Sequence, residues 1–279
     1  MRHIIFGDTG GHREPLFKAL VNLGMDPYTH VLPADVTVYH LGDLIHKGPD
    51  SEGVVDLVES IRQAGGNWVQ LAGNHEMQYL GGPLFWDSVV PERTQRTLHE
   101  WKHDGFLRFA AELPPTVLTT GDGTTRFNSP TFLTHAGISA PFLEAHLPGV
   151  RMSELVPALN ALSVPDLAMP GDMLGGIPVN LPPAGPVWAN GNSEVWKSWV
   201  LQGNMPMNQV VGHITPYSYS REQWFPGTFL GLMDSATVDR KKRTLLVPVY
   251  DRHILFNDPG FSKYATAVQP YSEFKESTP

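Results

Sequence analysis

The sequence predicts an α/β fold, with a βαβαβ unit in its first half and an antiparallel sheet in its second half. Over residues 4–71, short apolar runs alternate with amphipathic stretches. The crossovers of such a unit favour a parallel sheet with right-handed connections. The last two predicted strands, at 229–233 and 244–250, alternate in polarity and flank the turn-like run DRKKR. That pattern is typical of an antiparallel pair.

The elements of the first half follow from the spacing of apolar residues. The predicted elements are strands at 4–6, 37–41 and 68–71 and helices at 14–23 and 51–64. The three runs assigned to strands have the length of buried strands. In the second helix, Val54, Val58 and Ile61 recur at helical spacing and form one apolar face.

The second half is less regular. Residues 91–113 are predicted to be helical, with an aromatic and His-rich face. Further strands are predicted at 131–135, 209–213, 229–233 and 244–250. Residues 141–203 are rich in Pro and Gly, which favours a loop-rich flap, and the polar tail 269–279 is expected to be loosely held. We therefore expect one domain over residues 1–279, with a helical insertion near 84–113 and the flap near 141–203.

The composition fits an enzyme-sized globular chain of 279 residues, of which 41% are hydrophobic. A formal net charge of −8 argues against a nucleic-acid partner. The chain has no cysteine, so any metal must be held by His, Asp, Glu, Asn or water. The first apolar run, at 4–6, is too short for a signal peptide or a membrane span, so we expect a cytoplasmic protein with no membrane partner. The sequence predicts nothing about oligomeric state.

Three motifs place oxygen or nitrogen ligands directly after predicted strands. They are IIFGDTGGH at 4–12, HLGDLIHKGPDS at 40–51 and LAGNHE at 71–76. Strand ends of this kind meet at the carboxyl edge of an α/β sheet. Two divalent cations roughly 3.5–4 Å apart need a bridging carboxylate, and Asp43, on the expected central strand, is the natural bridge. Asp8 would hold the first metal and the amide oxygen of Asn74 the second.

Two histidines follow later predicted strands, His135 in FLTHAG and His213 in VVGHITP. A single histidine after a strand is more often a packed or hydrogen-bonded residue. Because this pair occurs in a chain that already carries three ligand motifs, we predict that both complete the shell of the second metal as neutral imidazoles. The whole set predicts a metal-dependent phosphoester hydrolase.

The order GD, GDLIHKGPDS, GNHE, THAG and GH resembles the calcineurin-like metallophosphoesterases. Within them it is most similar to the PPP-type branch, which contains bacterial serine/threonine protein phosphatases and symmetrical diadenosine tetraphosphatases. The resemblance runs from residue 4 to about residue 216 and implies two mixed β-sheets packed as a sandwich and flanked by helices. It implies that His75 lies beside the scissile phosphate as the general acid and that Lys47 contacts phosphate. The metal ligands it implies are Asp8, Asp43, Asn74, His135 and His213.

The first motif departs from the family pattern, which is Asp-x-His. Here Asp8 is followed by Thr9 and Gly10, and the histidine is displaced to His12. We predict that His12 reaches back through the paired glycines to the first metal, since glycine allows an unusual turn. The alternative is that this metal has lost a ligand.

Three further positions also depart from the pattern. His46 stands where protein phosphatases carry an Asp that orients the general-acid histidine, an Asp that the tetraphosphatases also lack. Lys47 replaces an arginine, which keeps a point charge but loses the bidentate fork. Asn190, in PVWANG, stands where relatives often have an arginine. We expect Asn190 to contact substrate, in a phosphate site that is weaker or differently arranged.

The predicted reaction is in-line attack on phosphorus by a hydroxide bound to two divalent ions. Asp43 and His75 are the catalytic residues, and the substrate contacts are Lys47, His75 and Asn190. Mn²⁺ is the expected metal, and Fe or Zn²⁺ also suits these ligands. Glu76 either supports an adjacent ligand or is a capping or exposed carboxylate.

The expected partner is a phosphorylated protein or small phosphoester, which makes the chain a PPP-like phosphatase. The first alternative is a dinucleoside polyphosphate hydrolase, which needs an aromatic shelf for adenine. The candidates for that shelf are Trp101, Trp188, Trp196, Trp199 and Trp224. The second alternative, prompted by the four departures, is a non-catalytic member that binds metal or phosphate.

Overall fold

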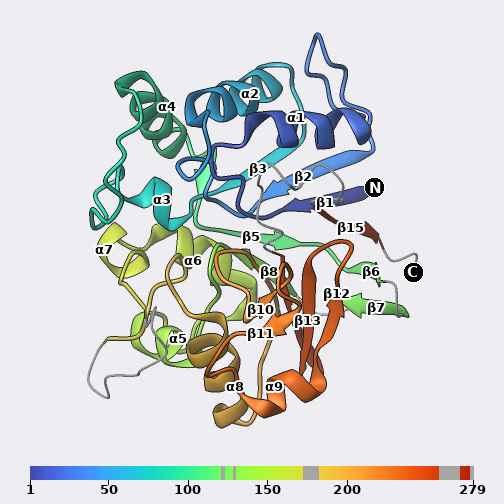
Figure 1. Ribbon diagram of the computed structural model, residues 1–279. Helices are drawn as coiled ribbons and strands as arrows, with labels where there is room; N and C mark the ends of the chain where they lie inside the picture. The colour runs from blue at the N-terminus through green and yellow to red at the C-terminus, as the bar shows by residue number, and fades with distance from the viewer. Residues whose placement is uncertain (121–122, 128–129, 172–181, 258–270, 277–279) are drawn as a thin grey trace.

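The computed structural model describes residues 1–120, 123–127, 130–171, 182–257 and 271–276. Two mixed β-sheets pack face to face, and helices cover their outer faces (Figure 1). The two-sheet sandwich expected from the resemblance is therefore confirmed. Among the described residues, no helix has both the length and the apolar character needed to cross a membrane.

The first sheet has seven strands. In spatial order they are β4 (Leu107–Arg108), β3 (Trp68–Leu71), β2 (Val36–His40), β1 (Arg2–Phe6), β15 (Tyr271–Glu276), β6 (Thr116–Thr120) and β7 (Gly123–Phe127). The first four strands run parallel, with Phe6 opposite His40 and His40 opposite Gln70. The predicted βαβαβ unit is confirmed, and its strands end at one edge of the sheet.

Two helices cover the outer face of this sheet, α1 (Arg13–Asn22) and α2 (Ser51–Gln63). Successive side chains of β1 point to opposite faces of the sheet, and both faces are buried. Ile4 and Phe6 pack among the helices, whereas Ile5 points to the second sheet. At the start of α2, the Asp50 side chain accepts a hydrogen bond from the Gly53 N–H, which caps the helix.

The second sheet has six strands. In spatial order they are β12 (Thr237–Asp239), β13 (Thr244–Val249), β14 (Arg252–Phe256), β9 (Asn208–Val211), β8 (Thr131–Thr134) and β5 (Ala110–Leu113). The pairs β8–β9 and β9–β14 are parallel, and the other pairs are antiparallel. Leu133, Val210 and Leu255 meet Ile5 and Leu41 in an apolar layer between the two sheets. That layer fixes the ends of β8 and β9 beside the ends of β1 and β2.

The region predicted as one helix over 91–113 divides into a helix and two strands. Helix α4 (Glu92–His103) ends where the chain turns at Asp104, whose carboxylate accepts a hydrogen bond from the Phe106 N–H. The chain then enters β4 of the first sheet and, after Phe109, β5 of the second. Of the aromatic residues after the turn, Phe109 is buried where the chain passes between the two sheets, and Phe106 packs edge-on against Trp101 of α4.

Two other expectations were wrong. Residues 229–233 were expected to form a strand but lie largely in α9 (Leu230–Ser235). In this helix Leu232 faces the core and is buried, whereas Leu230 lies on the solvent side. The tail also differs, since β15 is a central strand that pairs with β1 and β6 and buries Phe274. Composition alone did not reveal this pairing, because its partners lie far away in the sequence.

The described part of the predicted flap consists of short helices. They are α5 (Ala140–His146), α6 (Leu155–Ala161), α7 (Val164–Leu167), a π-helical turn (Gly191–Trp196) and α8 (Lys197–Gln202). Asn160 of α6 ties this region to β5, since its Oδ1 accepts the Phe109 N–H at 2.7 Å and its Nδ2 donates to Ala110 O. Residues 172–181 of the predicted flap lie outside the described residues.

Candidate metal centre

The loops that follow β1, β2 and β3 are in contact with one another. Gly42 has a φ of 105°, and a β-carbon there would lie 2.4 Å from the backbone N of Gly73. The N–H groups of Thr9 and Gly10 donate to Asp43 O at 3.0 and 2.7 Å. Asp43 itself has a φ of 56°, a region that few non-glycine residues adopt. The predicted motifs thus meet at the carboxyl edge of the sheet.

Glu76 holds this arrangement in place. It follows His75 in the short helix α3 (Asn74–Met77) and is fully buried. Its carboxylate accepts the N–H groups of Asp43, Leu44 and Gly73, each at 2.8 Å. Burial and the charge of Asp43 raise the pKa of Glu76, while these three donors favour its charged form. Glu76 therefore supports the backbone that carries Asp43.

A cluster of potential metal ligands lies at the centre of this edge. Asp43, His135 and His213 are buried and offer ligand atoms that all lie within 4.8 Å of one another. His135 Nε2 also lies 3.0 Å from Asn74 Oδ1, and Asp8 Oδ1 accepts the His213 N–H at 3.1 Å. All five side chains that the resemblance implies as ligands are therefore gathered in one place.

The chemistry of this cluster suits a cation. His135 Nδ1 lies 2.8 Å from Leu41 O, to which it donates its proton, so its Nε2 presents a lone pair. That lone pair faces the oxygens of Asn74 and Asp43 at 3.0 and 3.4 Å. Within the described part of the chain, the buried Nε2 of His213 has no hydrogen-bond partner. Burial also lowers the pKa values of His135 and His213, which favours the neutral imidazole form that binds metals.

Lys47 lies over the two carboxylates. Its ammonium nitrogen is 3.1 Å from Asp43 Oδ2 and 3.2 Å from Asp8 Oδ2. Burial disfavours the charged form of Asp43, but His135 and Lys47 keep its pKa below its ordinary value. The Lys47 side chain is 42% exposed, so its positive charge is accessible from solvent at the mouth of the site.

His75 lies beside the cluster and contacts a second histidine. Its Nε2 is 3.6 Å from Asp43 Oδ2, and its Nδ1 is 2.6 Å from Nδ1 of His46. His46 Nε2 in turn lies 2.7 Å from the Tyr79 hydroxyl. Burial lowers the pKa values of His75 and His46 to about 4. Tyr79 was not anticipated from the sequence, and it lies in the turn that follows α3, where its N–H donates to Glu76 O.

A second supporting contact that sequence reasoning missed joins Thr9 to His40. His40 Nδ1 accepts the Gly42 N–H at 3.2 Å, so Nε2 carries the ring proton and donates it to Thr9 Oγ1, 2.6 Å away. The ring is fully buried and stacks on Trp68. Burial lowers the pKa of His40 to about 3, so it is a neutral link between β2 and the residue after Asp8.

The structure places His12 directly before α1. Gly10 and Gly11 both have a positive φ, of 53° and 69°, so the paired glycines do form an unusual turn. The ring of His12 lies against the loop that carries Lys47, since a β-carbon at Gly48 would be 2.3 Å from His12 Nδ1. His12 is not part of the three-residue ligand cluster found among the described residues, and its role as a ligand stays a prediction.

Asn190, the predicted substrate contact, caps the π-helical turn. Its Oδ1 accepts the N–H groups of Asn192 and Ser193, each at 3.0 Å. Two residues earlier, Trp188 reaches the site, with its ring centroid 5.9 Å from that of His213. A substrate contact by Asn190 stays a prediction.

Aromatic side chains border the site. Phe85 and Trp86 lie with their ring centroids 4.9 and 5.0 Å from that of His75, and Phe85 also meets Trp188 at 4.6 Å. Of the proposed adenine-shelf residues, only Trp188 contacts a ligand histidine. The others pack elsewhere: Trp101 donates to Glu59, Trp196 stacks on Phe229, Trp199 donates to Ile138 O and Trp224 packs on Tyr217.

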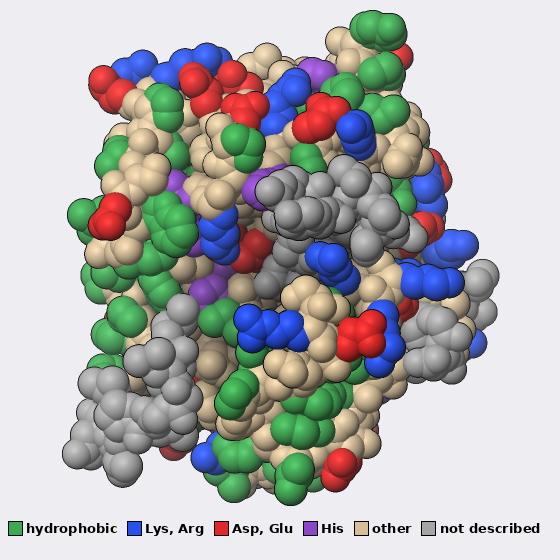
Figure 2. Space-filling view, in the orientation of Figure 1, with side chains coloured by type: hydrophobic (Ala, Val, Ile, Leu, Met, Phe, Trp, Pro, Cys, Tyr) green, Lys and Arg blue, Asp and Glu red, His purple; other side chains and the backbone are tan. Residues whose placement is uncertain are grey.

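The surface around the site combines charged, histidine and hydrophobic side chains. On the face shown in Figure 2, histidines gather near the middle, with basic and acidic side chains between them and hydrophobic side chains alongside. A cavity of about 430 Å³ adjoins the site and is lined in part by His46, Lys47 and Trp86.

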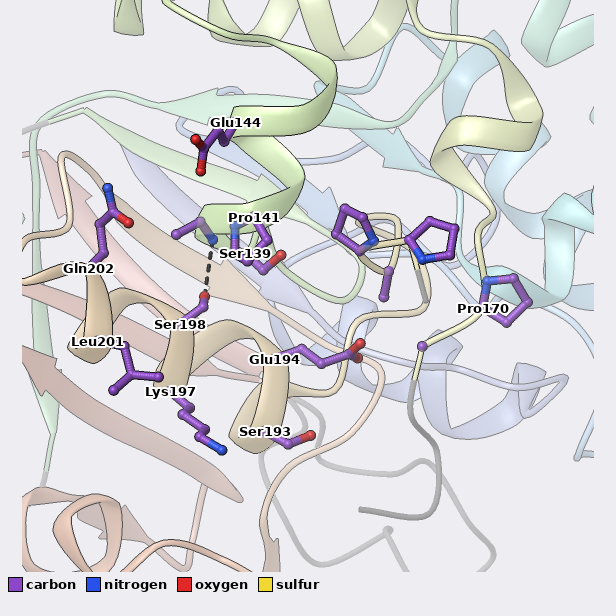
Figure 3. Close-up of a pocket in the computed structure, with 15 residues that line it drawn as sticks. Ser139, Pro141, Glu144, Pro170, Ser193, Glu194, Lys197, Ser198, Leu201 and Gln202 are labelled. Atoms are coloured by element: carbon purple, nitrogen blue, oxygen red, sulfur yellow. Dashed lines mark hydrogen bonds between the residues drawn. The ribbon is translucent and has the colours of Figure 1, made fainter. Parts of the chain in front are cut away.

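A cavity of about 460 Å³ lies elsewhere, between the start of α5 and α8 (Figure 3). Glu144, Glu194 and Lys197 line it, and the Ser198 hydroxyl accepts the Ala140 N–H across one side. Asp43, His135 and His213 do not line this cavity, so it is separate from the candidate metal centre.

Comparison with known proteins shows the family and the fold of this chain. The sequence matches the family described as calcineurin-like phosphoesterase over residues 1–239. No curated protein matches it. A cold-active protein-tyrosine phosphatase from a psychrophilic Shewanella species is similar in structure, with 17% identity, a TM-score of 0.50, and coverage of 91% of this chain and 77% of that one. At that identity the likeness shows the fold alone.

Two further solved structures are similar. A protein serine/threonine phosphatase from Saccharomyces cerevisiae has 12% identity and a TM-score of 0.49, with coverage of 100% of this chain and 81% of that one. A candidate diadenosine tetraphosphatase has 21% identity and a TM-score of 0.40, with coverage of 90% and 89%.

Proposed function

The chain belongs to the calcineurin-like phosphoesterase family, and we propose that it is a PPP-like phosphatase acting on phosphomonoesters. The family establishes a metal-dependent phosphoester hydrolase. The observation that supports a PPP-like phosphatase is the convergence of Asp43, His135 and His213, with Lys47 and His75 beside them. These groups provide a metal site, a phosphate-binding charge and a proton donor within one buried edge of the sheet.

We further propose that two divalent ions bind here. Asp8, His12 and Asp43 would hold the first ion, and the second would be held by Asp43, Asn74, His135 and His213. The bound ions supply Lewis acidity, which activates water and neutralises charge on the transferred phosphoryl group. Mn²⁺ is the proposed metal, because carboxylate, amide and imidazole ligands suit it, and Fe and Zn²⁺ share this ligand preference.

Two of the protein's own side chains, both next to Asp43 Oδ2, would act on the substrate. Lys47, which is 42% exposed, would bind the phosphate oxygens as a point charge. His75 would hold a proton on the imidazole nitrogen that faces the site and give it to the leaving oxygen. His46 and Tyr79 would fix the orientation of the His75 ring through their hydrogen bonds.

One observation favours a second candidate, a dinucleoside polyphosphate hydrolase. Trp188 lies next to His213 and could stack on a base. A solved structure of similar fold is a candidate diadenosine tetraphosphatase, but its TM-score of 0.40 gives no support. A cytoplasmic location, which we also propose, is compatible with either substrate.

The test is a side-by-side assay of p-nitrophenyl phosphate, a phosphopeptide and diadenosine tetraphosphate, with Mn²⁺ added and with a chelator as control. We expect chelator-sensitive hydrolysis of the two monoesters at a higher kcat/KM than that of the tetraphosphate. Faster cleavage of the tetraphosphate would select the second candidate. No turnover of any of them by metal-loaded protein would contradict the phosphatase proposal.

A further inference from the structure

We propose that Phe85 and Trp86 form a subsite for an aromatic ring on the leaving-group side of the metal centre. The preferred substrates would then be monoesters whose leaving oxygen is attached directly to an aromatic ring, as in phenyl phosphate or a phosphotyrosyl side chain. This inference rests on the proposed phosphatase function and names the substrate class of that site.

The first support is the position of the two rings around His75. Phe85 meets the imidazole edge-on, at 4.9 Å and 70°, and Trp86 does so at 5.0 Å and 64°. The two nitrogens of His75 are directed elsewhere, Nε2 towards Asp43 and Nδ1 to His46. The aromatic rings therefore border the group that would protonate the leaving oxygen.

The second support is the exposure of these rings. Phe85 packs on the buried ring of Trp188, with the two ring centroids 4.6 Å apart. Trp188 is 5% exposed, whereas Phe85 itself is 37% exposed. Leu84, next to it, is 77% exposed. An apolar ring left partly in water beside a buried catalytic histidine gains free energy when a second ring covers it.

The third support is that the loop is held in place. The Trp86 N–H donates to Gln78 Oε1, and the Val90 N–H donates to the Tyr79 hydroxyl at 3.1 Å. The Trp86 ring stacks on His46 at 5.8 Å with an interplanar angle of 12°. The same Tyr79 that supports His46 thus also fixes this loop, so the subsite and the proton donor are positioned together.

The adjoining cavity favours a monoester over a polyphosphate. Its volume is about 430 Å³, and Trp86, His46 and Lys47 form the side nearest the catalytic groups. Asp50 and Glu52 also line it. Carboxylates in the wall of this cavity repel additional phosphate groups but leave space for an aromatic ring with neutral or positive substituents.

The experiment compares the variant Phe85→Ala with the wild type on two pairs of substrates, phenyl phosphate with ethyl phosphate and phosphotyrosine with phosphoserine. The ratio of variant to wild-type kcat/KM is taken for each substrate, so that differences in leaving-group chemistry cancel. Phe225→Ala is the matched control, because Phe225 is similarly exposed, at 44%, and belongs to a different loop, where its N–H donates to Pro216 O. Phe85→Leu keeps an apolar side chain but removes the ring.

We expect Phe85→Ala and Phe85→Leu to lower kcat/KM about tenfold for both aromatic substrates, the effect of one aromatic pair, and less than twofold for both aliphatic ones. The inhibition constant of phenylphosphonate should rise by the same factor, while that of methylphosphonate stays unchanged. In Phe225→Ala, kcat/KM for every substrate and both inhibition constants should stay at the wild-type values. Equal losses for aromatic and aliphatic substrates, or no loss, would overturn the proposal. A larger loss for diadenosine tetraphosphate than for phenyl phosphate would also overturn it, since the ring bound would then be a distant base.

The phosphonates separate this proposal from the phosphatase function on which it rests. They bind without turnover, so their direct binding by calorimetry is measurable even in an inactive protein. If no substrate is hydrolysed, the phosphatase proposal fails, and loss of the preference for phenylphosphonate in Phe85→Ala still supports the aromatic subsite. Equal binding of phenylphosphonate and methylphosphonate by the wild type contradicts the subsite alone.

Discussion

The Nδ1 atoms of His46 and His75 lie 2.6 Å apart, so one of the two rings donates a proton to the other. The Tyr79 hydroxyl, 2.7 Å from His46 Nε2, completes this chain. Under the proposed mechanism His46 is a positioning residue for His75. It stands where the resemblance to the protein phosphatases implies an aspartate that orients the general-acid histidine.

We expect His46→Ala to lower kcat about 10- to 100-fold while the metal content stays the same, because an unsupported His75 samples unproductive orientations. His46→Asp should retain most activity, since the acid form of His75 carries a proton on both ring nitrogens and a carboxylate would accept the Nδ1–H. Steady-state kinetics together with metal analysis of the purified variants checks this. An unchanged kcat in His46→Ala, or loss of a metal, would show that the contact does not position His75.

Glu76→Gln should destabilise the loop that carries Asp43. An amide has one oxygen where the carboxylate has two, so its NH₂ group would face a backbone N–H and leave it unsatisfied. The expected cost is about 1–3 kcal/mol of unfolding free energy, with weaker metal binding. Chemical denaturation measures the first effect, and Glu14→Gln, an exposed site on α1, is the control. Wild-type stability and metal affinity in Glu76→Gln would refute the supporting role.

Burial of His40 makes stability depend on pH. Its pKa is about 3 in the folded protein and near 6.5 when unfolded, so between these values the unfolded chain binds more protons. The contribution of His40 is thus fully present above pH 6.5 and falls as the pH drops towards 3, by roughly 1.4 kcal/mol per pH unit. His40→Gln should reduce the slope of unfolding free energy against pH between 6.5 and 5, and His99→Gln, on the exposed side of α4, should not. Identical slopes in wild type and His40→Gln would contradict this.

His12→Ala should weaken binding of the first metal and leave the second in place. Asp8 and Asp43 alone would give that metal two protein ligands, and the turn at Gly10 and Gly11 provides the backbone freedom for a third. A crystal structure with metals bound decides the question directly. An imidazole nitrogen about 2.0–2.1 Å from the first metal supports the assignment. A ring that stays against Gly48, with both metals bound, would show it to be wrong.

Much of the site could be predicted because it depends on a local rule. Consecutive parallel strands end at the same edge, so Asp8, Asp43 and Asn74 had to meet once their strands were recognised. His135 and His213 follow from the same rule, applied to the parallel strands β8 and β9 of the second sheet.

Other features could not be predicted because they depend on contacts distant in the sequence. The polar tail gave no sign that β15 would pair with β1, some 270 residues earlier, as in the pair Arg2–Lys275. Phe85 and Trp86 lie in a loop without periodicity, and only the fold brings them to His75. Residues 229–233 form a short apolar run for which periodicity alone does not separate helix from strand.

The central claim is that Asp43 bridges two divalent ions that are required for phosphoester hydrolysis. Its most direct test is the number of metal ions per chain, measured together with phosphatase activity, in the wild type and in Asp43→Asn after loading with Mn²⁺. We expect about two ions and chelator-sensitive activity in the wild type, and fewer than one ion and no measurable activity in the variant, because the shared anionic ligand is gone. Two ions bound to Asp43→Asn, with activity within about tenfold of the wild type, would contradict the account.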